Sequence, residues 1–194
     1  MKHPEILLLP LLGFVDYFLT VLGAIERDKE HARHFKMEQY ELNPIWQKSI
    51  NQRKWFNPRH ALLIIVATGV LALLFQFADL PEGCIQLLPG AVFVVYGVIV
   101  ARHLGNIFIF RYLARRPDRI AGEITMSHQL VLRLSAAQLA PVVVAVALIA
   151  IFSGNNFAWG GLLGASMLFC VHLVWMLKAA RRKKPAIQLS DAPA

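Results

Sequence analysis

The chain alternates long apolar segments with shorter polar ones. Five segments are almost free of charge. Each is long enough for a helix that crosses the hydrocarbon core of a bilayer, which is about 30 Å thick and needs about 20 apolar residues. They lie at residues 6–25, 61–77, 85–110, 135–152 and 157–177. The pattern predicts an all-α fold, an integral membrane bundle of five transmembrane helices.

The composition favours a membrane protein over a soluble one. Hydrophobic residues make up 57% of the 194 residues and charged residues 16%, and the charges come in blocks between the apolar segments. The apolar share exceeds that of an ordinary soluble domain, which is about half. Cys84 and Cys170 are expected in an external loop and in the last span, so we predict no disulfide between them.

The basic residues predict the orientation of the bundle. The net charge is +8, and every one of the 20 Lys and Arg residues except Lys2 lies in or beside the segments 26–60, 102–133 and 178–184. Cytoplasmic loops of membrane proteins carry the excess of Lys and Arg. We therefore expect a multi-pass protein of the cell (inner) membrane with its amino terminus outside and its carboxyl terminus in the cytoplasm.

The cytoplasmic loop 26–60 contains helix signals of its own. It opens with oppositely charged residues at three- and four-residue spacing, which predicts that the first helix continues beyond the membrane. The dipeptides Asn43-Pro44 and Asn57-Pro58 each suit the start of a helix. The residues between them predict an amphipathic helix that lies on the bilayer surface.

Three further expectations concern the second half of the chain. The polar segment 115–134, with Pro117 near its start, is predicted to form a helix that leads into the fourth span. The motif formed by Gly160 and Gly164 brings helices together, either inside the chain or between chains. Residues 1–184 are expected to form one membrane domain, and residues 185–194 a disordered cytoplasmic tail.

Three ionisable side chains inside the predicted spans are the first candidates for a functional site: Asp16, Arg102 and His103. A charge inside a membrane is costly and normally faces protein or water. Counted from the cytoplasmic ends of their spans, Asp16 lies about 14 Å deep and Arg102 about 12 Å deep. We therefore expect a buried pair of Asp16 and Arg102, with His103 as a competing partner.

Other polar residues of the spans belong to the same region. Thr20 shares a helix face with Asp16, and Asn106 lies one turn after Arg102. Gln138 and His172 are each about 8 Å inside the cytoplasmic boundary. If these faces converge, they line a polar cavity open toward the cytoplasm. The candidate ligand-binding residues are Asp16, Thr20, Arg102, His103, Asn106, Gln138 and His172. The alternatives are a structural role in helix packing and catalysis.

No cofactor and no metal site is predicted. A b-type haem needs axial His residues from facing helices, but His103 and His172 are expected at different depths. His31, His34 and Glu38 share one helix face, yet a helix with such mixed charges is normally a solvated surface. No nucleophile motif, phosphate loop or dense set of metal ligands is present, so no residue is assigned a catalytic role and the chain is not expected to be an enzyme.

Two short motifs carry a family resemblance. Asp16-Tyr-Phe-Leu-Thr20 and Glu41-Leu-Asn43-Pro44 resemble the Asp-x3-Thr and Glu-x-Asn-Pro signature of small uncharacterised prokaryotic multi-pass membrane proteins, classed as a domain of unknown function. The resemblance covers the first span and the loop after it, and the gap between the motifs is longer here. It implies no activity, but it implies that the two motifs form one functional or structural unit. On its own, Glu-x-Asn-Pro indicates a helix stop and restart.

These observations favour one function and leave two alternatives. The favoured function is the binding or movement of a small polar or ionic solute by the polar cluster. The alternatives are a non-enzymatic accessory or scaffold subunit of a membrane complex, and an intramembrane enzyme that acts on lipid headgroups. Expected partners are the bilayer with its anionic headgroups, and a second copy or another membrane protein. Nucleic acid is not expected, because no binding motif accompanies the basic residues.

Overall fold

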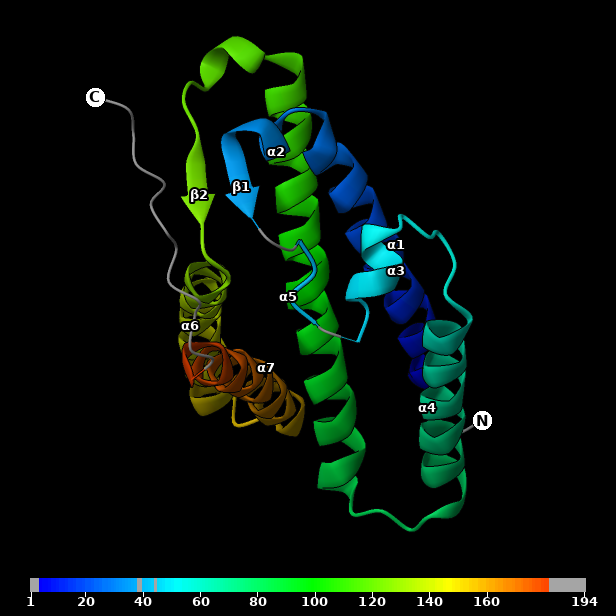
Figure 1. The fold of residues 1–194 in the computed structure, drawn as a ribbon. Coiled ribbons are helices and arrows are strands. Elements are labelled where there is room, and N and C mark those ends of the chain that lie inside the picture. Colours follow the sequence, from blue (N-terminus) through cyan, green and yellow to red (C-terminus); the bar gives the residue numbers. More distant parts are fainter. Residues whose placement is uncertain (1–3, 38–39, 44, 182–194) are drawn as a thin grey trace, which may run out of the picture.

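Five long helices account for most of the described structure (Figure 1). The computed structural model describes residues 4–37, 40–43 and 45–181, so the tail predicted at 185–194 lies outside the described residues. The long helices are α1 (Leu8–Lys29), α4 (Pro58–Phe77), α5 (Glu82–Arg115), α6 (His128–Ser153) and α7 (Asn156–Arg181). Each is long enough and apolar enough to cross a membrane, α1 together with the preceding turn η1 (Pro4–Leu7). The five predicted helices are confirmed, and all extend beyond their predicted apolar segments.

Helix α5 is at the centre of the fold. α1 and α7 both pack along α5, while α4 packs against α1 and α6 packs against α7. In Figure 1 α5 stands upright, with α1 and α4 to its right and α6 and α7 to its left. α6 and α7 cross α5 steeply and are seen almost end-on. The order of the helices across the fold is therefore α4, α1, α5, α7, α6.

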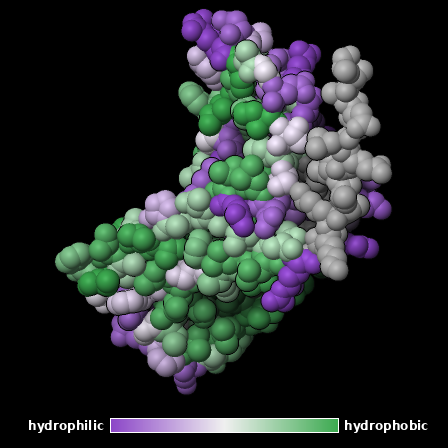
Figure 2. Space-filling model, turned by 60° about the vertical axis from the view of Figure 1, so that its left-hand side comes forward, coloured by the Kyte–Doolittle hydropathy of each residue, from purple (hydrophilic) through white to green (hydrophobic). Residues whose placement is uncertain are grey.

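The outer surfaces of the long helices are apolar. α4, for example, exposes a row of large side chains: Leu62, Leu63, Ile65, Val66, Val70 and Leu73. Figure 2 shows hydrophobic residues over the lower part of the molecule and hydrophilic residues gathered at its upper end, where α5 ends. Soluble monomers rarely expose a contiguous apolar area larger than a few hundred Å². This exterior is therefore suited to hydrocarbon rather than to water.

Glycines bring α5 and α7 into backbone contact. A Cβ added to Gly160 would overlap the carbonyl oxygen of Leu87, and one added to Gly164 would overlap that of Ala91. A Cβ on Gly90 of α5 would likewise overlap the backbone of α7. Of the two roles expected for the glycine motif, the structure therefore supports contact between helices inside the chain.

Two short strands pair in parallel at the polar end of the helices. β1 (Phe35–Met37) follows the one-turn helix α2 (His31–His34), and β2 (Ile124–Met126) follows the turn η2 (Pro117–Arg119). The sequence predicted continuous helix in both places. The prediction is wrong for the two strands, although α1 does continue past its apolar segment to Lys29 and α6 does begin ahead of the fourth apolar segment, at His128. Strand pairing joins segments about 90 residues apart, and such a tertiary contact outweighs a weak local helix preference.

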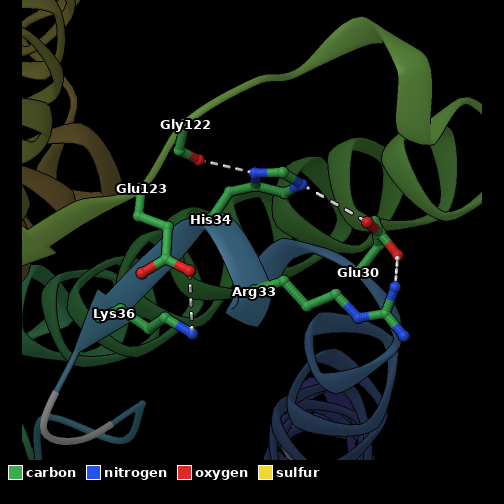
Figure 3. Close-up of polar contacts among 6 residues, drawn as sticks. All are labelled: Glu30, Arg33, His34, Lys36, Gly122 and Glu123. Carbon is green, nitrogen blue, oxygen red and sulfur yellow. Dashed lines mark hydrogen bonds and ion pairs between the residues drawn. The ribbon is translucent and has the colours of Figure 1, made fainter.

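Side chains beside the strands fasten the two loops together (Figure 3). His34 lies between two acceptors, because its Nδ1 is 2.8 Å from the carbonyl oxygen of Gly122 and its Nε2 is 3.4 Å from the carboxylate of Glu30. Lys36 Nζ lies 3.7 Å from the Glu123 carboxylate, an exposed pair that contributes little on its own. Both ring nitrogens of His34 therefore face acceptor oxygens, one of them from the loop before β2.

The segment between β1 and α4 folds back along α1. It contains the short helix α3 (Gln47–Asn51), whose Ile50 is 1% exposed and packs in a core cluster with Tyr17 and Val21. The prediction that this helix turns its apolar side to the bilayer is wrong for Ile50, because packing against α1 buries more of that side chain. Trp55, at 51% exposed, remains on the outside.

Asn57 starts α4 as predicted. Its Oδ1 accepts hydrogen bonds from the backbone N–H groups of Arg59 (3.0 Å) and His60 (3.3 Å), and Pro58 is the first helical residue. Its Nδ2 donates to Ser49 Oγ at 2.9 Å. The same residue therefore caps α4 and ties it to α3.

The contact between α5 and α7 predicts opposite effects for two glycine substitutions. Gly160→Ala should destabilise the protein by about 1–3 kcal/mol, because the backbone of α5 leaves no room for a methyl group. Gly105→Ala on α5 is the matched control, since nothing lies within 4 Å of an added Cβ there; it should be neutral or stabilise by up to about 1 kcal/mol. Thermal unfolding in mild detergent measures both, and equal effects would contradict this packing.

Candidate functional site

A cavity of about 430 Å³ lies between α1, α5, α6 and α7, and the segment between β1 and α4 closes one side of it. All seven side chains predicted from the sequence to share a site line this cavity: Asp16, Thr20, Arg102, His103, Asn106, Gln138 and His172. Glu41 and Asn43 of the second motif line it as well, while Pro44 lies outside the described residues. Four helices and one loop thus bring their polar residues to one place.

Asp16 pairs with His103. The Nε2 atom of His103 lies 3.1 Å from Asp16 Oδ1 and 3.0 Å from Thr20 Oγ1. The expected pair of Asp16 and Arg102 is wrong, and the competing partner His103 takes its place. Residues 102 and 103 are neighbours on α5 and point about 100° apart, so only one of them can face α1.

The hydrogen bonds around Thr20 indicate which nitrogen of His103 carries the proton. The Thr20 hydroxyl donates to the carbonyl oxygen of Asp16 at 2.9 Å, so its oxygen is left to accept from His103 Nε2. Nε2 is therefore the N–H that serves both Thr20 and the Asp16 carboxylate. The other nitrogen, Nδ1, is buried and has no hydrogen-bond partner among the described residues. Nε2 alone therefore makes the contacts of His103 with α1.

Arg102 turns the opposite way, toward α6. Its Nη2 donates to Ser135 Oγ at 2.8 Å, and among the described residues no carboxylate lies within ion-pair distance of it. His172 of α7 is 7% exposed, and its Nδ1 donates to the carbonyl oxygen of Leu168 at 2.9 Å. The side of the cavity formed by α6 and α7 therefore has one permanent positive charge and neutral polar neighbours.

The second motif places a carboxyl group in the cavity wall. Glu41 Oε1 accepts from the backbone N–H of Asn43 at 2.7 Å, and Gln47 Nε2 donates to the Glu41 carbonyl oxygen at 3.0 Å. Burial raises the pKa of Glu41, and the nearby Asp16 carboxylate adds to this, while the Asn43 bond and His103 act in the opposite direction. Asp16 and Glu41 therefore share one electrostatic environment.

Asn43 does not cap a helix, contrary to the prediction. Its Oδ1 accepts from the backbone N–H of Ile45 at 3.1 Å, which is a local turn, and α3 begins only at Gln47 without a side-chain cap. The motif thus shapes the loop so that Glu41 and Asn43 reach the cavity. The two motifs that carry the family resemblance come together in space.

The start of α4 shows where the cavity lies along the helices. The ring of His60, the third residue of α4, is 4.8 Å from the ring of Tyr17 and 5.1 Å from that of Trp46. The Tyr17 hydroxyl donates to the Lys54 carbonyl oxygen at 2.9 Å. Asp16 is next to Tyr17, so the Asp16–His103 contact lies level with the first turn of α4. Counting residues from the predicted span ends placed this contact deep among the long helices, and the structure does not.

Aromatic and histidine side chains that the sequence did not assign to the site complete the cavity wall. Burial, assisted by Arg27 and His34, lowers the pKa of His31 to about 4, so this ring is neutral near pH 7. Burial raises the pKa of Tyr40 to about 12, and the nearby Glu41 carboxylate adds to this. Both come from the loop after α1, and no sequence signal places that loop against the helices.

Above the cavity a second polar contact ties α1 to α5. Glu26 is 6% exposed, and its carboxylate lies 3.1 Å from Arg111 Nε and 2.7 Å from Lys29 Nζ. The Arg27 guanidinium lies 5.7 Å from the centre of the Tyr40 ring. Charge contacts therefore hold the extended ends of α1 and α5 together, whereas apolar packing holds their lower parts.

Metal binding has no support in the described part of the chain, where no group of three or more His, Cys, Asp or Glu side chains is placed to hold an ion. Comparison with known proteins adds no family: no family model, no curated protein and no solved structure matches this chain. The geometry of the cavity is therefore the basis for inferring a function.

The raised pKa of Glu41 predicts a pH-dependent cost to stability. The folded protein holds the proton above the ordinary value of 4.5, whereas the unfolded chain releases it there, so stability should fall as the pH rises from about 4.5 through the folded pKa. Glu41→Gln should remove this fall and be more stable than the native protein at pH 7. Melting temperatures between pH 4 and 8 measure it, with the exposed Glu123→Gln as the control. A wild-type pH profile in Glu41→Gln would contradict the assignment.

Proposed function

We propose that this protein spans the cell's inner membrane with its amino terminus outside and its carboxyl terminus in the cytoplasm. In this proposal the cavity binds or moves a small polar or ionic solute from the cytoplasmic side. The observation that carries the proposal is the convergence of the seven polar side chains, from four helices, on one cavity of about 430 Å³. Ligand pockets are typically about 300–1,000 Å³ in volume.

Membrane insertion is supported by the exterior of the helices. The five long helices have the length and apolarity that a bilayer needs, and their outward-facing side chains are mostly large and apolar. The orientation is supported by the positive-inside rule, because every Lys and Arg except Lys2 lies in or beside the segments 26–60, 102–133 and 178–184. The first two of these segments meet through β1 and β2. In this orientation the cavity lies near the cytoplasmic headgroups.

A binding role explains the cavity better than helix packing alone does. Polar side chains that only hold helices together satisfy one another directly. Here His103 Nδ1 is buried without a described partner, and Arg102 has a hydroxyl partner where a carboxylate is expected. Such groups are completed by water or by a bound solute.

Access to the cavity can be tested with a pair of cysteine variants at nearly the same depth on α5. Ile99 lines the cavity, whereas Gly97 is exposed with nothing within 4 Å of an added Cβ, which in a bilayer means lipid. In a background without Cys84 and Cys170, the thiol of Ile99→Cys should react with a charged, membrane-impermeant reagent applied to inside-out vesicles. That of Gly97→Cys should not react.

The two outcomes that count against this proposal are distinct. No reaction at Ile99→Cys from the cytoplasmic side would mean that the cavity is closed to solutes. Equal reaction at both positions would mean that the reagent reaches α5 without passing through a cavity.

The orientation can be tested with a native cysteine. Cys84 lies in the first turn of α5 and is exposed, so in the proposed topology it faces the outside. In a Cys170→Ser protein, an impermeant maleimide should label Cys84 in intact cells. Labelling only from inside-out vesicles would reverse the proposed orientation.

A further inference from the structure

Resting on the proposed function, we infer that the solute carries an oxyanion, a carboxylate or phosphate group, which binds to Arg102. The permanent charge of Arg102 faces the cavity beside Ser135, Gln138 and His172. An arginine stays charged in proteins and presents a planar fork that fits the paired oxygens of a carboxylate or a phosphate. One bond to the Ser135 hydroxyl leaves most of this fork for a ligand.

No carboxylate among the described residues that line the cavity is left to balance the charge of Arg102. Its two carboxylate side chains have partners of their own, since Asp16 binds His103 and Glu41 accepts from the Asn43 backbone. Arg102 is the one Lys or Arg side chain among the described residues that line the cavity. A half-buried cation is normally paired, because an unpaired one keeps its desolvation cost. The missing counter-charge on the α6 side is therefore an anion from outside the described chain.

The neighbours of Arg102 are suited to an anion. His172 lies close enough for the charge of Arg102 to act on it. Its Nδ1 donates to the Leu168 carbonyl oxygen, so this ring brings no negative charge to the group. The side-chain amide of Gln138 supplies N–H donors. No acidic side chain lies in this group.

The remaining wall fits an organic acid better than a bare ion. Around the polar group lie the apolar side chains of Val131, Leu134, Leu168 and Trp175. A volume of about 430 Å³ holds about 14 waters at about 30 Å³ each, which is also room for an acid with a short carbon chain. Because the cavity lies level with the start of α4, the headgroup of an anionic lipid presents the same chemistry.

The test uses the full chain in dodecyl maltoside and follows the melting temperature by tryptophan fluorescence. Three probes are added: hexanoate, inorganic phosphate, and phosphatidylglycerol with phosphatidylcholine as its uncharged control. At saturation at least one of the anions should raise the melting temperature by about 5 °C or more. The same anion should slow the reaction of the Ile99→Cys thiol with the charged reagent.

Arg102 is tested against a matched arginine on the same helix. Arg102→Gln should weaken the anion by about tenfold or more, whereas Arg115→Gln, at the exposed end of α5, should keep wild-type affinity. Arg102→Lys retains the charge without the fork, so its affinity should fall between the two. Without an anion, Arg102→Gln should be at least as stable as wild type, since it removes an unpaired charge. A merely structural Arg102 would instead make this variant less stable.

Each outcome has one meaning. A response to hexanoate or phosphate indicates a water-soluble acid, a response confined to phosphatidylglycerol indicates a lipid headgroup, and both support the inference. No response to any anion, or equal responses in Arg102→Gln and Arg115→Gln, would overturn it. If Ile99→Cys is nonetheless reactive from the cytoplasmic side, the proposed function stands and only the anion is wrong.

Discussion

The contact between Asp16 and His103 is the interaction on which the rest of the arrangement depends. It joins α1 to α5 at 3.1 Å and sets the rotation of α5 about its axis. Because consecutive helical residues point about 100° apart, turning His103 toward α1 turns Arg102 away from it and toward Ser135 of α6. A cavity then opens between the two directions, with an acidic side and a basic side.

Two different kinds of packing hold this rotation in place. Below the cavity, the glycines of α5 and α7 allow backbone contact that a single methyl group would block. Beside and above it, Ile50 and Tyr17 anchor the loop to α1, and the Glu26–Arg111 contact ties the helix ends. Below the cavity the helices are thus held by close backbone packing, and above it by polar contacts. This is the division expected where a protein passes from hydrocarbon to water.

The sequence predicts those features that depend on local pattern. Apolar segments of about 20 residues locate the helices, Asn57-Pro58 locates the start of α4, and ionisable residues within apolar segments locate the cavity. It does not predict β1 and β2, because three-residue strands depend on a partner about 90 residues away. Nor does it decide between Arg102 and His103 as the partner of Asp16, since both occur at the right depth and only the rotation of α5 separates them.

The loop after α1 shows why the depth of the site along the helices is harder to predict from the sequence than the residues that form it. Counting residues from the end of a span assumes that the span ends at the membrane surface. Here α1 and α5 extend past the first turn of α4, and the loop returns along α1 until Tyr17 meets His60. The loop therefore brings Glu41 and Asn43 down to Asp16, where a carboxyl group from the loop completes a site begun by the helices. In the proposed membrane topology, a polar cluster in this position lies at the boundary between lipid and water, where an anion can arrive from either phase.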